Sequence, residues 1–223
     1  MRAISAKMAG VPVNPTKVVC VGLNYRAHAQ EMNKSIPDEP LLFLKPPSAL
    51  IATGEAIVRP RGYQRMDYEG ELAVVIGKRA RRVSRERALD YVRGFACLND
   101  VTVRDLQVKD VQYTRAKGFD TFCPVGPRVV EGLDPSRLTI LTRVNGVTKQ
   151  KSTTADLIFD VPTLVSFVSR VMTLEEGDLI STGTPPGVGP LVAGDVVEIE
   201  IEGIGILSNP VVDEPPGAEG VAG

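Results

Sequence analysis

The stretch Asp67-Tyr68-Glu69-Gly70-Glu71-Leu72-Ala73-Val74-Val75-Ile76-Gly77 places two carboxylates just before an apolar run. The run is rich in β-branched residues, which predicts a buried strand over residues 72–76. Because side chains alternate along a strand, Glu69 and Glu71 share one face. Two like charges beside a buried strand are costly to desolvate unless a cation or a basic group lies between them. Taken alone, the pattern fits either a metal site or the exposed edge of a strand.

A third carboxylate follows a second apolar run. Phe95-Ala96-Cys97-Leu98-Asn99-Asp100 predicts another buried strand whose C-terminal end presents Asp100. Three convergent carboxylates are hard oxygen ligands, which suit Mg²⁺, Mn²⁺ or Ca²⁺. The chain has no cluster of cysteine or histidine, which argues against zinc. We therefore expect Glu69, Glu71 and Asp100 to hold a divalent cation.

The rest of the chain predicts a mixed β fold with short helices. Asn145-Gly146 lies between two strand patterns and is the dipeptide of a type I′ hairpin, since both residues tolerate positive φ. Further strands are expected at 18–21, 41–44, 139–144, 178–182, 196–201 and 204–207. Short helices are expected at 25–32, 85–91, 102–108 and 162–171.

Composition limits the class of protein. The 223 residues fit a single domain, expected over 1–212, followed by a loose Gly/Pro-rich tail over 213–223. The 26 basic and 27 acidic residues nearly cancel, so neither nucleic acid nor an anionic membrane is an expected partner. The one basic run, over residues 78–87, predicts a solvated connection, with a phosphate or partner contact as the alternative.

Cellular context follows from what the sequence lacks. We expect a cytoplasmic protein, because the N-terminus has no apolar signal and no segment has the length of a membrane span. Cys20, Cys97 and Cys123 show no pairing or metal-ligand spacing and are expected to be buried and reduced.

The only histidine, His28, is followed three residues later by Glu31. On a helix this carboxylate can hold the imidazole and raise its basicity, as a general base requires. A purely structural histidine is the alternative. Arg104 and Gln107 are also three residues apart, and Lys117 adds a further cation.

A Gly/Pro loop at residues 181–190 carries hydroxyls, Thr184 among them, and free amides that could bind a carboxylate. It matches neither a phosphate loop nor a dinucleotide fingerprint, so no organic cofactor is expected.

Several long motifs in order resemble the fumarylacetoacetate hydrolase family: VGLNYRAHAQEM, LLFLKPPSAL, DYEGELAVVIG, GFACLNDVTVRDLQ, TRAKGFDTFCPVGP and DLISTGTPPGVGP. The resemblance implies a rolled β-sandwich, usually a homodimer. It also implies that Glu69, Glu71 and Asp100 are metal ligands, that His28 and Glu31 form a catalytic dyad on a short lid, and that Lys117 faces the substrate. By the same resemblance, the residues lining the pocket are Tyr25, Lys45, Arg104, Gln107 and Thr184.

The chain is similar to the short branch of that family, which includes acylpyruvate hydrolases, oxaloacetate decarboxylases and 2-hydroxyhepta-2,4-diene-1,7-dioate isomerases. The resemblance implies Mg²⁺- or Mn²⁺-dependent cleavage of a C-C bond, hydrolytic or decarboxylative, in a small 2-oxo or 2,4-dioxo acid through a metal-stabilised enolate. The alternatives are an isomerase of 2-hydroxy-dienoate diacids in aromatic catabolism and a catalytically silent metal-binding scaffold. The polar segment 32–40 is expected to be a lid that is mobile without ligand.

Overall fold

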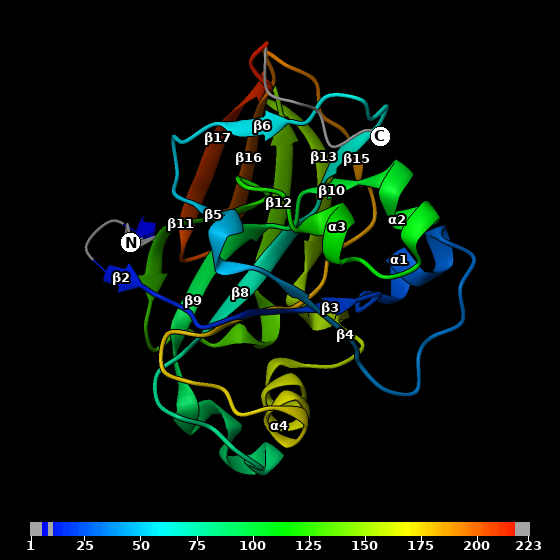
Figure 1. Ribbon diagram of the computed structural model, residues 1–223. Helices are drawn as coiled ribbons and strands as arrows, with labels where there is room; N and C mark the ends of the chain where they lie inside the picture. Colours follow the sequence, from blue (N-terminus) through cyan, green and yellow to red (C-terminus); the bar gives the residue numbers. More distant parts are fainter. Residues whose placement is uncertain (1–5, 9–10, 217–223) are drawn as a thin grey trace.

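Two curled β-sheets face one another in the computed structural model, which describes residues 6–8 and 11–216 (Figure 1). The larger sheet has the strand order β4-β3-β14-β8-β9-β11-β5, and the smaller facing sheet has the order β13-β12-β16-β17-β6. Strands β10-β7-β15 form a third sheet, and β1 pairs with β2. This arrangement confirms the predicted rolled β-sandwich with short helices.

The strands of the larger sheet are β4 (Leu41–Lys45), β3 (Val18–Gly22), β14 (Leu179–Ser181), β8 (Gly70–Ile76), β9 (Val92–Asn99), β11 (Cys123–Val130) and β5 (Leu50–Ile51). Those of the smaller facing sheet are β13 (Val147–Thr153), β12 (Thr139–Val144), β16 (Val196–Ile201), β17 (Gly205–Asp213) and β6 (Ile57–Arg59). The remaining strands are β10 (Thr102–Val103), β7 (Met66–Tyr68), β15 (Gly189–Pro190), β1 (Ala6–Met8) and β2 (Val11–Val13). The α-helices are α1 (Arg26–Glu31), α2 (Arg104–Asp110), α3 (Thr114–Lys117) and α4 (Val161–Val171).

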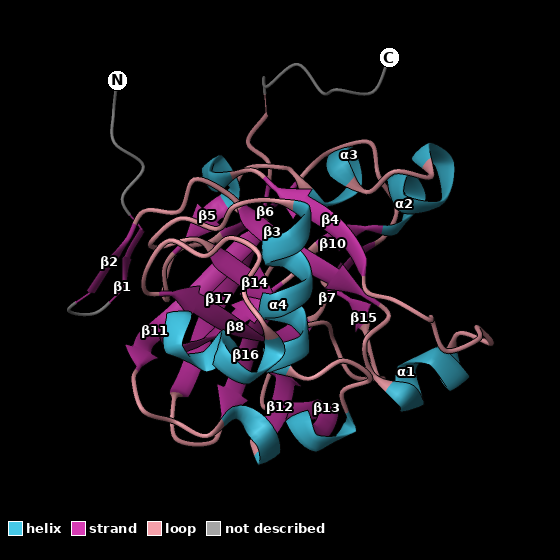
Figure 2. Cartoon of the chain, turned by 90° about the horizontal axis from the view of Figure 1, so that it is seen from below, coloured by secondary structure: helices cyan, strands magenta, loops and turns pink. Residues whose placement is uncertain are grey.

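Strand β8 is buried along its whole length because both of its faces are covered. Leu72 and Val74 belong to the core cluster between the two sheets. Ala73 and Val75 point the other way, into a second cluster. Helix α4 crosses in front of the strands in Figure 2 and adds Leu164 to the first cluster. The continuous apolar run that the sequence shows is therefore a central strand rather than an edge.

Most predicted elements are confirmed. Asn145 and Gly146 have φ of 52° and 76°, as a type I′ turn requires. Helix α4 begins where expected, and the Asp160 side chain caps it by accepting from the Thr163 amide at 3.0 Å. The three cysteines are free and buried.

One of the remaining helix predictions is confirmed and one is wrong in part. Residues 85–91 form a helix, of the 3₁₀ type. Thr102 and Val103 belong to strand β10, and helix α2 begins only at Arg104. The tertiary reason is that Thr102 pairs with Asp67 of β7, which holds this stretch of backbone extended.

Strand β11 was not predicted, because its sequence CPVGPRVV contains two prolines and a glycine. It lies between β9 and the two-residue strand β5, and its pairing with β9 shifts register between Gly126 and Val130. That irregularity accommodates proline in a strand that has neighbours on both sides.

Toward the C-terminus, β17 runs to Asp213, which pairs with Arg59 of β6. The Glu214 amide donates to the Arg59 carbonyl at 3.0 Å, so these first residues of the expected tail are held. Residues 217–223 of that tail lie outside the described residues. Within the described ranges, no helix combines the length and apolar character that crossing a membrane requires.

Candidate active site

Glu69 and Glu71 are placed on one face by the strand geometry of β7 and β8. They continue the row of Ala73 and Val75, while Gly70 faces the other sheet. A β-carbon at Gly70 would overlap the Thr142 hydroxyl of β12, so only glycine fits between the two glutamates. The Glu-Gly-Glu pattern thus combines two aligned carboxylates with close packing of the two sheets.

Asp100 reaches the same place from the neighbouring strand. Gly70 pairs with Asn99 of β9, and the Asp100 amide donates to the Glu69 carbonyl at 2.9 Å. Ligand atoms of Glu69, Glu71 and Asp100 lie within 4.8 Å of one another. All three side chains are buried. The predicted convergence of three carboxylates is therefore present in the structure.

Two buried lysines compensate this negative charge. The Lys117 ammonium donates to Glu69 Oε2 at 2.9 Å, Asp100 Oδ2 at 2.6 Å and Thr102 Oγ1 at 2.7 Å. The Lys45 ammonium donates to Asp100 Oδ1 at 2.5 Å and to the Val101 carbonyl at 3.1 Å. Burial acts to lower the pKa of Lys117, but Asp100 and then Glu69 outweigh it and raise that pKa above its usual range.

Arg104 supplies a third cation from the first turn of α2. Its guanidinium contacts Asp67 Oδ2 at 2.8 Å, Glu69 Oε1 at 2.6 Å and Gln107 Oε1 at 2.7 Å. Burial would raise the pKa of the Glu69 carboxyl, yet Lys117 and Arg104 together lower it to about 2. Glu69 is thus an anion across the physiological range.

Glu71 behaves in the opposite way. Burial, followed by the charges of Asp100 and Glu69, raises the pKa of the Glu71 carboxyl to about 8. Its Oε2 accepts from the Ser181 hydroxyl and from the Gly183 amide at 2.8 Å. A divalent cation would remove this electrostatic cost, and each of the three carboxylates keeps at least one oxygen lone pair for it. The three ligands and their charges therefore fit a hard divalent metal ion.

The dyad predicted on α1 is assembled. His28 Nδ1 lies 2.9 Å from Glu31 Oε2, and Glu31 Oε1 accepts from the Gly187 amide at 3.3 Å. With Nδ1 engaged by the carboxylate, Nε2 of His28 is the nitrogen left to exchange a proton. Helix α1 lies at the periphery of the molecule, outside the sheets (Figure 2).

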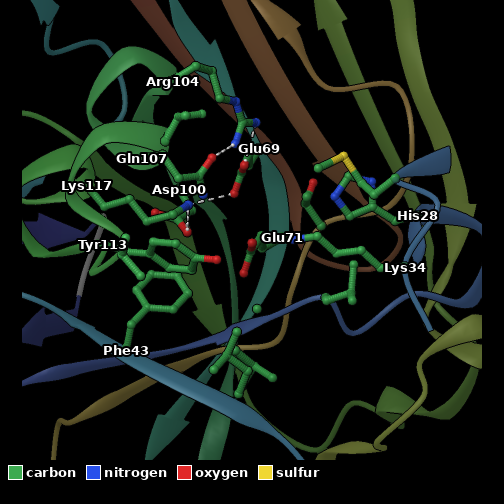
Figure 3. A pocket seen from close by; sticks show the side chains of 18 residues that line it. His28, Lys34, Phe43, Glu69, Glu71, Asp100, Arg104, Gln107, Tyr113 and Lys117 are labelled. Atoms are coloured by element: carbon green, nitrogen blue, oxygen red, sulfur yellow. Dashed lines mark hydrogen bonds and ion pairs between the residues drawn. The ribbon is translucent and has the colours of Figure 1, made fainter. Parts of the chain in front are cut away.

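The carboxylates open into a cavity of about 500 Å³. Figure 3 shows Lys117 and Arg104 on one side of it and His28 on the other. Among the residues placed in the site on sequence grounds, those that line the cavity are His28, Glu69, Glu71, Asp100, Arg104, Gln107, Lys117 and Thr184. The Thr184 hydroxyl is already bonded, donating to the Gly70 carbonyl at 3.0 Å and accepting from Gln150 at 2.8 Å.

Two residues expected in the pocket do not line it. Tyr25 is fully buried, and its backbone bridges to Leu157. Lys45 is also buried and contacts Asp100 from behind the cavity wall. Lys117 does line the cavity, but three protein oxygens already accept from its ammonium. In this structure it holds the carboxylates in place rather than presenting a free donor.

The cavity also contains residues that the sequence did not single out as site residues. Lys34 lies beside His28, and Tyr113 and Phe43 lie together on the Lys117 side (Figure 3). The Phe43 and Tyr113 rings meet edge to face with centroids 5.3 Å apart, and the Lys117 ammonium lies 5.0 Å from the Phe43 centroid. Tyr113 stands four residues before Lys117, a spacing that offered a weak signal. Phe43 offered none.

Comparison with known proteins identifies the family. A family model described as fumarylacetoacetate (FAA) hydrolase C-terminal matches residues 17–212. The chain belongs to the fumarylacetoacetate hydrolase family. The Bacillus subtilis oxaloacetate tautomerase YisK is 43% identical to it over 216 residues, which cover 91% of this chain and 72% of that protein.

Solved structures agree with this assignment. The 2-hydroxyhepta-2,4-diene-1,7-dioate isomerase of Mycobacterium marinum matches with a TM-score of 0.86 and 48% identity, over 91% of this chain and 77% of that one. The fumarylpyruvate hydrolase of Pseudomonas aeruginosa, in complex with Mn²⁺ and pyruvate, matches with a TM-score of 0.88 and 33% identity, over 94% and 95%. Similar proteins thus include a hydrolase, a tautomerase and an isomerase.

Proposed function

We propose that this protein is a divalent-metal-dependent enzyme that cleaves a C-C bond, by hydrolysis or decarboxylation, in a small 2-oxo or 2,4-dioxo acid. The observation that carries the proposal is the buried triad of Glu69, Glu71 and Asp100 in a cavity that is also lined by His28, which pairs with Glu31. A hard-ligand site that faces a general base is the arrangement such chemistry needs.

Glu69, Glu71 and Asp100 would hold Mg²⁺ or Mn²⁺. When bound, that ion would act as a Lewis acid toward the carboxylate and 2-oxo oxygens of the substrate, where negative charge develops as the C-C bond breaks. The choice of these ions rests on the carboxylate ligands and on the Mn²⁺ of the Pseudomonas relative.

His28 would act as the general base. Glu31 orients the imidazole through Nδ1, so Nε2 would take a proton from a water molecule that attacks the distal carbonyl of the substrate. Lys117 and Arg104 keep Glu69 ionised and fixed in place. Both cations also stabilise negative charge that develops in the cavity.

A proton transfer without C-C cleavage is the second candidate, and the tautomerase and isomerase relatives favour it. The same histidine would then move a proton between carbon atoms or between carbon and oxygen. The two reactions need the same metal ligands and the same base. They differ in whether a water molecule is positioned beside the substrate.

On the family resemblance we also propose that the protein is a homodimer, which sedimentation velocity would test.

The experiment is a substrate panel. Acylpyruvates, fumarylpyruvate, oxaloacetate and 2-hydroxy-dienoate diacids are assayed with Mg²⁺ and with Mn²⁺, following the ultraviolet absorbance of the enol and the products. Metal-dependent product formation from an acylpyruvate or oxaloacetate supports cleavage. Enol-keto exchange without cleavage supports the second candidate. No metal-dependent change with any substrate would identify a silent scaffold and contradict the proposal.

A further inference from the structure

The cations that line the cavity differ in what they already bind. Lys117 faces Glu69 and Asp100, and Arg104 faces Asp67 and Glu69. Lys34 lines the same cavity, yet within residues 6–8 and 11–216 its ammonium has neither a hydrogen-bond partner nor a carboxylate within ion-pair distance. Of the three, Lys34 is the one whose charge the described protein leaves uncompensated.

Hydrogen bonds at the end of helix α1 fix the backbone of Lys34. Asn33 adopts φ of 50°, the Lys34 amide donates to the Ala29 carbonyl at 2.9 Å, and the Asn33 amide donates to the Gln30 carbonyl at 3.0 Å. In this helix-ending pattern, the residue that follows the one with positive φ commonly packs an apolar side chain against the helix. Here that residue is an exposed lysine. Its backbone is therefore tied to the helix that carries His28, while its side chain remains free.

The position of Lys34 suits the far end of a substrate. Figure 3 shows it beside His28, across the cavity from Lys117 and Arg104. The remaining wall is largely apolar, with Val21, Leu23, Met32, Leu41, Phe43, Val108 and Val111. An ammonium that has no carboxylate neighbour among the described residues attracts one anionic group from the ligand. The carboxylate that belongs beside the triad is the one adjacent to the 2-oxo group, so Lys34 would meet a different group.

We propose that Lys34 recognises a second carboxylate, at the end of the substrate remote from the 2-oxo group, and so selects 2-oxo dicarboxylates over 2-oxo monocarboxylates. This inference rests on the proposed function and specifies its substrate class. Because Lys34 and His28 share α1, an ion pair with the second carboxylate also steadies the helix that carries the base.

The test is a binding experiment with two acids that share the same carbon chain length. 2-Oxoglutarate ends in a carboxylate and 2-oxopentanoate ends in a methyl group, and calorimetry measures the affinity of each for the Mn²⁺-loaded protein. The wild type is expected to prefer 2-oxoglutarate by about two- to fivefold, the scale of one exposed ion pair. Lys34→Met should reduce that preference to near unity, whereas Lys34→Arg should retain it.

Two further variants serve as controls. Lys151→Met removes an exposed lysine of β13 that does not line the cavity, and it should keep the wild-type preference. Lys34→Gln, which keeps a polar side chain, replaces Lys34→Met if circular dichroism shows that the methionine variant is misfolded. A preference that survives in a folded Lys34→Met or Lys34→Gln variant would overturn the inference.

The outcomes separate the inference from the function on which it rests. Mn²⁺-dependent binding of 2-oxopentanoate by the wild type, with no added affinity for 2-oxoglutarate, overturns the role of Lys34 and leaves the proposed function standing. Binding of neither acid contradicts the proposed function itself. A dicarboxylate preference that disappears with Lys34 supports both.

Discussion

The two sides of the cavity are built in different ways. Glu69, Glu71 and Asp100 lie on adjacent central strands, and none of the three is more than 6% exposed. His28 and Glu31 lie on a six-residue helix that has no side-chain N-cap, and the Glu31 side chain is 42% exposed. The first side is fixed by two packed sheets, and the second is attached by a few hydrogen bonds. The carboxylate side is thus more deeply buried and more extensively bonded than the base side.

The difference has an energetic basis. A buried carboxylate is tolerated only when cations and hydrogen bonds compensate it, so the triad requires Lys45, Lys117 and Arg104 to be fixed as well. His28 lies on the peripheral helix α1, and one carboxylate is enough to orient its ring. Substitutions on the two sides of the cavity should therefore differ in whether they lower metal binding, stability or turnover.

The largest effect is expected from the metal ligands. Glu69→Ala, Glu71→Ala and Asp100→Ala should each abolish activity, since a site of few anionic ligands loses its ion when one is removed. EDTA should inactivate the wild type reversibly. Calorimetric titration with Mn²⁺ checks the binding, and full activity in metal-free protein would contradict the metal requirement.

Glu71 offers a matched variant that separates metal binding from stability. Because its pKa is raised to about 8, the carboxyl of the metal-free protein is largely protonated at neutral pH, and Glu71→Gln resembles that form. It should lose the metal yet unfold at nearly the wild-type temperature. Glu69→Gln leaves Lys117 and Arg104 partly unpaired and should cost about 3–5 kcal/mol of stability. Equal unfolding temperatures for the two variants would show that charge compensation is not what holds the triad.

On the other side, His28→Ala should lower turnover by roughly 10²-fold, the scale of general acid-base catalysis. Affinity for Mn²⁺ should stay near that of the wild type, because the histidine is not one of the three clustered carboxylate ligands. Steady-state kinetics and metal titration on the same preparation check both points. Loss of the metal in His28→Ala would make the histidine a ligand and remove the contrast between the two sides.

A smaller effect is expected for Glu31→Gln. The amide keeps a hydrogen bond to His28 but loses the charge of the carboxylate, so turnover should fall by about tenfold, as loss of one charge-assisted bond implies. Steady-state kinetics with the best substrate check this. A variant with wild-type turnover would mean that the bond from His28 to Glu31 is structural only.

The smallest effect concerns motion. Oxalate with Mg²⁺ mimics the charge of the reacting end of the substrate, and it should slow hydrogen exchange of the amides over residues 27–38 as the lid orders. Amides of β8 and β9 should exchange slowly with or without ligand, which makes them the internal control. Equal exchange over 27–38 in a protein shown to bind both would mean that the dyad is preformed and that the two sides are equally rigid.

Much of this protein is determined locally by its sequence. The alternation of side chains places Glu69 and Glu71 on one face, the Asn145-Gly146 pair specifies the hairpin, and the Asp160 cap starts α4. His28 and Glu31 meet because three residues make nearly one turn of helix. Each of these follows from a short-range period or a local dihedral preference, so no knowledge of the fold is needed.

Only the tertiary structure decides which charges meet. Asp100 is shared by Lys45 and Lys117, which lie 55 and 17 residues away in the sequence. Family resemblance placed Tyr25 and Lys45 in the pocket, but both are fully buried and neither lines the cavity, and Lys45 forms an ion pair with Asp100. Lys34 appears in the sequence as one of many surface lysines, and only the folded chain shows it lining the cavity without a partner among the described residues. The reason is physical: side-chain direction has a local period, whereas the pairing of charges depends on which strands become neighbours.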